Sequence, residues 1–515
     1  MTVSTIQPPV TELIGAFAAA PPDRIGQEYL RLAEAVWNGG TPPRDVALAA
    51  VPALVALLDE PGDRRKAYVA VLLGLLAESE YPEYGELQAA VGQGLDRCLD
   101  LLRRTPADRP LSYALRYLVA HFPADRDRVL AAAEGLDIGS DDLARLDRAL
   151  QRLDPDAPVL GRVFPSPSVW TLDEAEREFD QAWIAALTPE QVRHNWDCDT
   201  RTVLGHAGAK AYWAAGNGAP ERTDPGPAPS RDAVRAPAVD LGAEVFRPHA
   251  AAFRCPRCGG GLEFETGAAR CGGCGTVHPL AGGVLDLTAP EEGKDTEDFL
   301  RRLSEIPTMG LFYEALARPA FLRISGSNWG GEVSRAAEDA YIASHVRPVE
   351  GPVLDLGAGA GSWTAVLAEA VGPERVIALD VNPAMLALLH SRLPKVASVL
   401  AGADDLPFDD ASLGAVMCWN ALQAFPDDAP AAIAEVGRCL RPGGTFTIMT
   451  FRMSEDPVAR YFQRCHHLPQ HTEGLRLFDV AELRRWLSAA GLVVREEWSP
   501  GTFVFLTAEK AGGPA

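Results

Sequence analysis

The chain of 515 residues is 47% hydrophobic and carries a formal net charge of −22 at pH 7. This length accommodates about two to four domains. The negative charge disfavours nucleic acid as a partner, because nucleic-acid-binding surfaces neutralise phosphates with Lys and Arg. No apolar run reaches the roughly 18 residues of a membrane span, and the N-terminus lacks a signal-peptide pattern, so we expect a cytoplasmic protein without a membrane partner.

Residues 1–160 carry apolar side chains at helical spacing. Val51, Leu54 and Val55 occupy positions i, i+3 and i+4, and the pattern returns at 69–76 and 115–122. Short turns rich in Pro, Gly and Asp separate these amphipathic helices. The region resembles HEAT-like repeats, in which helix pairs stack into a solenoid, and an ordinary helical bundle is the alternative. A solenoid surface would bind a protein partner or a peptide substrate.

Two further segments precede the first cysteine cluster. Residues 161–215 are predicted to form a helical bridge, because Thr171 and Thr188 each begin a capping signature that opens a helix. Residues 216–248 are rich in Pro, Ala, Gly and charge, which predicts a linker.

Four of the nine cysteines form two C-x2-C pairs twelve residues apart. They are Cys255, Cys258, Cys271 and Cys274. A glycine follows each pair, which permits tight turns that bring the thiolates together. The spacing predicts a zinc ribbon at residues 249–290, with one structural zinc because four cysteines close its tetrahedral shell. Two disulfides are the alternative, which a reducing compartment disfavours.

Residues 353–361 read V-L-D-L-G-A-G-A-G, a buried-strand pattern that runs into alternate glycines, and Asp380 ends the next apolar run. This arrangement is typical of a nucleotide-binding βαβ unit, in which the acidic residue accepts hydrogen bonds from a ribose. A dinucleotide fingerprint requires glycine at 362, where this chain has Ser362. The spacing therefore favours S-adenosylmethionine over NAD.

The rest of the C-terminal region follows the order of a doubly wound sheet. Asn382 and Pro383 open a helix, Leu-Pro-Phe stands at 406–408, an apolar strand at 414–418, and Arg-Pro-Gly-Gly at 441–444. Together these motifs resemble class I S-adenosylmethionine-dependent methyltransferases of the type 11 group. The expected fold class is therefore multidomain: a HEAT-like α-helical N-terminal region, a small zinc ribbon, and an α/β Rossmann-like methyltransferase domain at residues 291–515.

The resemblance also implies a cofactor site. Asp355 and the glycine loop would hold the methionine part of S-adenosylmethionine, Asp380 its ribose, and residues after the next two strands its adenine and methyl group. The predicted cofactor-binding residues are Tyr313, Asp355, Gly357, Ala358, Gly359, Gly361, Asp380, Val381, Met385, Ala403, Asp404 and Asn420. The family often has aspartate where this chain has Gly402, so Asp404 or Asp405 would pair with the adenine amino group.

Catalytic candidates lie in the insertion between Phe451 and Phe478, which holds Tyr461, Cys465 and three histidines. The three are His466, His467 and His471. A histidine there would serve as a general base. The alternative is a polar lid whose histidines are merely exposed.

The sequence therefore predicts a methyltransferase that uses S-adenosylmethionine and contains zinc. Its expected substrate is a small molecule or a peptide precursor of specialised metabolism, with the helical region as docking surface. Two alternatives remain. The first is an rRNA or tRNA methyltransferase, because the ribbon also resembles that of bacterial rRNA methyltransferases and of the small activator subunit of tRNA and protein methyltransferases. The second is a catalytically inactive scaffold that binds the cofactor.

Overall fold

The computed structural model describes residues 9–158, 182, 184–221, 241–288, 328–425, 427–465 and 476–512. The chain divides into two compact units. The first comprises Met1–Asp224, Arg323–Gly330 and Ser454–Leu475, and the second comprises Pro225–Leu322, Gly331–Met453 and Arg476–Ala515. The five-part domain division expected from the sequence remains a prediction. In the described ranges, no helix combines the length and the apolar character needed to cross a membrane.

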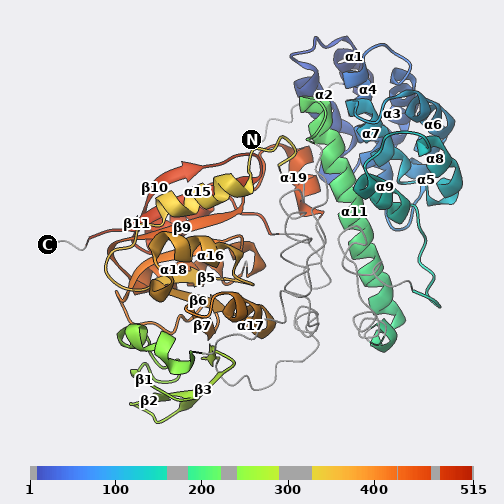
Figure 1. The fold of residues 1–515 in the computed structure, drawn as a ribbon. Coiled ribbons are helices and arrows are strands. Elements are labelled where there is room, and N and C mark those ends of the chain that lie inside the picture. The colour runs from blue at the N-terminus through green and yellow to red at the C-terminus, as the bar shows by residue number, and fades with distance from the viewer. Residues whose placement is uncertain are drawn as a thin grey trace, which may run out of the picture. The chain divides into compact units, whose positions relative to one another are not determined.

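The first unit is helical (Figure 1). Its α-helices are α1 (Val10–Ala19), α2 (Ile25–Val36), α3 (Arg44–Leu57), α4 (Asp63–Glu78), α5 (Glu86–Gly92), α6 (Leu95–Arg104), α7 (Pro110–Val119), α8 (Arg126–Ala133), α9 (Ser140–Ala149), α11 (Pro189–Asn217) and α19 (Pro457–Arg464). The expected cap at Thr188 is confirmed: its side chain accepts a hydrogen bond from the backbone of Gln191, and the Gln191 side chain accepts one from the backbone of Thr188.

Helix α4 lies at the centre of this unit and departs from the expected amphipathic pattern. Every residue from Ala67 to Glu78 is buried. The periodicity at 69–76 identifies one apolar face of the helix. The positions between, such as Val71 and Leu75, are apolar too. A helix that is apolar on every face is buried on all sides. A central helix of this kind is what the bundle alternative requires. The HEAT-like arrangement stays a prediction.

Helix α19 belongs to the helical unit although it follows the fifth strand of the methyltransferase region in the sequence. It lies beside α11 (Figure 1), and Phe462 is fully buried in the helical core. Tyr461 Oη donates a hydrogen bond of 2.9 Å to the buried carboxylate of Glu78, and Tyr212 Oη donates one of 2.6 Å to Asp456. The described part of the insertion, up to Cys465, therefore contributes buried side chains such as Val458 and Phe462 to this unit, and the polar lid named as the alternative stays a prediction.

The second unit is built on an eleven-stranded sheet in the order β1-β2-β3-β4-β7-β6-β5-β8-β9-β11-β10. The strands are β1 (Leu262–Glu265), β2 (Ala268–Cys271), β3 (Val277–Ala281), β4 (Val284–Asp286), β5 (Val353–Leu356), β6 (Val376–Asp380), β7 (Ala397–Leu400), β8 (Leu413–Trp419), β9 (Leu440–Phe451), β10 (Leu492–Trp498) and β11 (Phe503–Lys510). The α-helices are α15 (Arg335–His345), α16 (Ser362–Val371), α17 (Pro383–Arg392), α18 (Ala429–Cys439) and α20 (Val480–Ala489).

Strands β7, β6, β5, β8 and β9 are parallel, and β11 returns antiparallel between β9 and β10. Along the chain, α16 lies between β5 and β6, α17 between β6 and β7, and α18 between β8 and β9, as in a doubly wound sheet, while residues 401–412 join β7 to β8 without a helix. The Rossmann-like fold expected for the methyltransferase region is therefore confirmed.

The cysteine-containing hairpins continue the same sheet. Strand β4 pairs in parallel with β7, with Val284 opposite Ser398, while β3 pairs antiparallel with β4. The hairpin turn contains Gly283, where a Cβ would come 2.1 Å from Nε2 of His390 on α17. Glycine is therefore needed where the turn lies close to His390. Strand β4 covers the edge that β7 would otherwise leave unpaired.

We predict that Gly208→Ala destabilises the helical unit. Alanine favours a helix by about 1 kcal/mol over glycine, but a Cβ on Gly208 of α11 would come 2.2 Å from the Phe462 ring. Overpacking of this kind costs about 1–3 kcal/mol. Urea unfolding followed by circular dichroism measures the change in free energy.

The matched control is Gly15→Ala in α1, where an added Cβ meets no heavy atom within 4 Å. This substitution should leave stability equal or raise it. Equal effects of the two substitutions would contradict the close packing of α19 on α11.

Candidate functional site

The glycine loop follows the carboxyl end of β5. Asp355, near the end of this strand, is buried and accepts a hydrogen bond of 2.6 Å from Thr364 Oγ1 on α16. Gly357 has a φ of 76°, and a Cβ there would come 2.4 Å from the Cβ of Ala421. The loop after β5 therefore packs directly against the loop after β8, and only glycine permits that contact.

Asp380 ends β6 and holds the glycine loop in place. Its Oδ2 accepts a hydrogen bond of 2.8 Å from the Gly359 N–H, and its Oδ1 accepts one of 2.9 Å from the Asn382 N–H. Removal from water raises the pKa of the Asp380 carboxyl, although these N–H groups act in the opposite direction. Each carboxylate oxygen keeps acceptor capacity for a ligand hydroxyl.

An apolar surface adjoins Asp380. Val381 has an exposed fraction of 69%, the largest of any large apolar side chain in the described part of the chain. Met385 packs with Leu388 on the next turn of α17 and with Ala360 of the glycine loop. The expected cap of α17 is confirmed, since Asn382 Oδ1 accepts hydrogen bonds from the first turn of that helix. An exposed apolar residue beside a polar carboxylate fits a ligand with a flat ring and a ribose.

The loop after β7 carries the remaining adenine candidates. Ala403 is partly buried and Asp404 is exposed. Asp405 forms an ion pair of 2.5 Å with Arg254. Of the two aspartates expected to pair with the adenine amino group, Asp404 is therefore the one without this ion pair.

Asn420 follows β8 in a left-handed backbone conformation, with a φ of 52°. Its N–H donates to the carbonyl of Met449, and the side chain of Gln423 donates to Asn420. Thr450 in turn donates to Gln423. Sequence reasoning missed Gln423 and Thr450. The signal for Gln423 was a polar residue inside the apolar run Ala421–Phe425.

The other predicted site residues cannot be placed. Tyr313, His466, His467 and His471 lie outside the described residues. Their roles stay predictions.

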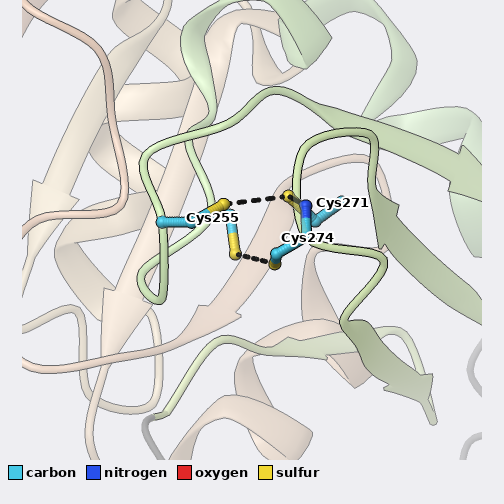
Figure 2. A group of neighbouring side chains, drawn as sticks. Cys255, Cys271 and Cys274 are labelled. Atoms are coloured by element: carbon cyan, nitrogen blue, oxygen red, sulfur yellow. Dashed lines mark hydrogen bonds between the residues drawn. The ribbon is translucent and has the colours of Figure 1, made fainter.

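The four predicted metal ligands lie together, and Figure 2 shows three of them, Cys255, Cys271 and Cys274, at facing turns. Their Sγ atoms are all within 4.8 Å of one another, with 3.8 Å between Cys255 and Cys274 and 3.4 Å between Cys258 and Cys271. Zinc–sulfur bonds of about 2.3 Å in a tetrahedron place sulfur atoms about 3.8 Å apart. The donor set and its spacing therefore fit zinc.

Neighbouring polar groups favour the thiolate form of Cys274 in this cluster. The Thr276 hydroxyl is 3.1 Å from the Cys274 Sγ and lowers the pKa of that thiol to about 6. His278 Nε2 lies 3.5 Å from the Cys255 Sγ. Donors to metal-bound sulfur orient the ligands and lower their charge density.

Comparison with known proteins agrees with this site. Residues 353–444 match the family described as Methyltransferase domain. An uncharacterised chloroplastic methyltransferase of Arabidopsis thaliana is 28% identical over 257 residues, which cover 47% of this chain and 70% of that protein. A probable phthiotriol/phenolphthiotriol dimycocerosates methyltransferase of Mycobacterium ulcerans is 37% identical over 137 residues, 25% of this chain and 53% of that protein.

A crystal structure of a putative methyltransferase from Bacillus halodurans is 18% identical, with a TM-score of 0.30, and covers 35% of this chain and 100% of that one. The family match and the sequence relatives show that residues 353–444 carry a methyltransferase domain of the kind that uses S-adenosylmethionine, as the motifs predicted.

We predict that Gly357→Ala destabilises the α/β unit more than Gly359→Ala does. Both glycines have positive φ values, 76° and 53°, so both substitutions introduce backbone strain. Only at Gly357 would the new Cβ collide with Ala421. The difference in free energy of unfolding should be about 1–3 kcal/mol, measured by urea unfolding. Equal losses would show that the two loops do not touch in solution.

Proposed function

We propose that this methyltransferase acts on a small molecule or a peptide precursor of specialised metabolism. The observation that carries the proposed cofactor site is the arrangement at the carboxyl ends of β5 and β6. There the Asp380 carboxylate lies between the glycine loop and the exposed Val381. S-adenosylmethionine supplies an electrophilic methyl group on its sulfonium when bound.

The chain's own residues provide binding and orientation. Asp380 accepts hydrogen bonds from the two ribose hydroxyls, and Val381 with Met385 forms the apolar contact for the adenine. Asp404 accepts from the adenine amino group, and Ala403 contacts the ring edge. Positioning of this kind is the main requirement for an in-line transfer, because alignment of the reacting atoms supplies much of the rate.

The methionine part of the cofactor belongs at the other end of the site. The loop Gly357–Gly361 and Asp355 hold it, and Asn420 faces the methyl group or the substrate. Tyr313 belongs to the same proposed site. A histidine among His466, His467 and His471 is the proposed base that removes the substrate's proton.

The substrate class follows from charge and from relatives. A net charge of −22 disfavours RNA, since phosphate binding depends on cations. The Mycobacterium ulcerans relative is named as a probable phthiotriol/phenolphthiotriol dimycocerosates methyltransferase, and its name refers to no nucleic acid. In this proposal the helical region, with HEAT-like repeats, is a docking surface for a peptide or a partner.

The cysteine cluster is proposed to hold one structural zinc. Four sulfur ligands leave no open position for a substrate, so the metal would stabilise the ribbon and take no part in the reaction. Because β4 of this ribbon pairs with β7, the metal would also stabilise the edge of the methyltransferase sheet.

We predict that the protein binds S-adenosylhomocysteine and that Asp380→Ala weakens this binding at least about tenfold, or about 1.4 kcal/mol. Titration calorimetry measures it. Asp409→Ala, which changes an exposed aspartate of the same unit, should leave the affinity unchanged. Circular dichroism checks that both variants are folded. Tight NAD binding without any response to S-adenosylhomocysteine would overturn the cofactor assignment.

The pH dependence gives a second check on Asp380. The ionised carboxylate accepts ribose hydrogen bonds, whereas the protonated form loses acceptor capacity. Because the pKa of Asp380 is raised, affinity should fall as the pH drops through that raised value, at a higher pH than for an ordinary aspartate. Asp380→Asn should flatten this dependence.

We predict one zinc per chain by elemental analysis of the purified protein. The double substitution Cys258→Ser with Cys274→Ser should remove it and lower the melting temperature, since two of the four ligands are lost. Cys198→Ser, which changes a cysteine of the helical unit, should retain the metal. Stoichiometric zinc in the double variant would place the metal elsewhere.

A further inference from the structure

The amide of Gln423 has only one chemically possible orientation. One of its terminal atoms lies 2.9 Å from the backbone carbonyl oxygen of Asn420. A carbonyl oxygen only accepts hydrogen bonds, so this terminal atom must be Nε2. Thr450 Oγ1 lies 2.9 Å from the other terminal atom, Oε1, and donates to it. Both Gln423 and Thr450 are buried, so water does not compete for these bonds.

The orientation of Gln423 then determines that of Asn420. The same Nε2 atom lies 2.9 Å from the side-chain oxygen Oδ1 of Asn420 and gives it the second amide hydrogen. A nitrogen at that position would leave two donors facing each other. The Asn420 side chain therefore directs its Nδ2 group away from Gln423. Among the described residues, none accepts a hydrogen bond from Nδ2.

The position of Asn420 relates this donor to the proposed cofactor. The neighbouring Ala421 is in contact with the loop at Gly357, so both loops border the same place at the carboxyl edge of the sheet. Asn420 is only partly buried, and its φ of 52° lies in the left-handed region, which asparagine adopts more readily than most residues other than glycine. The hydrogen bond from its N–H to the Met449 carbonyl fixes the backbone at this position.

We infer that Asn420 presents a fixed hydrogen-bond donor to an acceptor oxygen beside the glycine loop, and that Gln423 is the positioning residue that sets this polarity. The inference rests on the proposed cofactor site. Two sources offer such an oxygen: the carboxylate of the cofactor's amino-acid part, or an oxygen of the substrate. In either case the amide discriminates against a protonated amine at this point, because an N–H group gives no hydrogen bond to an ammonium.

The test compares two probes that differ in one part. S-adenosylhomocysteine carries the amino-acid carboxylate, and 5′-methylthioadenosine has the same adenosine without it. Asn420→Asp keeps the shape and the acceptor for Gln423 but replaces the outward donor with an acceptor. If the cofactor carboxylate is the partner, this variant should bind S-adenosylhomocysteine at least about tenfold more weakly and 5′-methylthioadenosine within about threefold of wild type.

If the partner is the substrate, both affinities stay within about threefold of wild type. Transfer of tritium from labelled cofactor into the accepting extract fraction then falls at least about tenfold in kcat/KM. Gln423→Met, which removes the constraint and keeps the side-chain length, should show a smaller loss with the same selectivity. Gln423→Leu also shortens the side chain, so its loss should be at least as large as that of Gln423→Met.

Three results would overturn the inference. The first is an Asn420→Asp variant with unchanged or tighter S-adenosylhomocysteine binding and unchanged methyl transfer. The second is an Asn420→Asp variant that loses affinity for both probes equally. The third is a Gln423→Met variant whose binding and transfer equal those of wild type. A wild-type protein that binds neither probe would instead overturn the proposed cofactor site.

Discussion

The carboxylate of Asp380 is the contact on which the arrangement of the site depends. It accepts N–H groups from two separate elements, the loop after β5 through Gly359 and the start of α17 through Asn382. Without it, the N–H groups of Gly359 and Asn382 would have to find water. The start of the loop would keep its backbone hydrogen bonds to the Leu379 carbonyl of β6, but the part around Gly359 would lose its tie to that strand. Removal of this carboxylate from water costs free energy, and the two N–H groups offset part of that cost.

Local chemistry explains which features were predictable from the sequence. The glycine loop, Asp380 and the cap at Thr188 each act within one or two adjacent elements, so the residue types and their spacing specify the geometry. The pair Gln423 and Thr450 is separated by 27 residues, and Glu78 and Tyr461 by 383. Such contacts depend on how distant elements pack. No local spacing reveals them.

The same limit explains the expectations that failed. Periodicity identified a helix at α4 but not its burial on all faces, because burial depends on how many neighbours surround the helix. The sequence offered a histidine base or a polar lid for the insertion after β9, and it did not indicate that α19 packs in the helical core, because that contact joins elements far apart in the chain. The cysteine spacing indicated that the thiols lie close together. It did not predict that β4 pairs with β7, because that pairing joins strands far apart in the sequence.

The position of α19 has a consequence for the order in which the protein folds during synthesis. Helix α11 and the helices before it leave the ribosome first, while α19 follows about 240 residues later, on the order of 10 to 50 seconds at ordinary elongation rates. Until then, Gly205 and Gly208 on α11 lack the side chains of Cys465 and Phe462, although Tyr117 of α7 already lies near Gly208, and Glu78 lacks the hydroxyl of Tyr461. The helical unit is therefore completed only after most of the second unit has been made, and a nascent chain halted before α19 leaves this side of α11 without its partner helix.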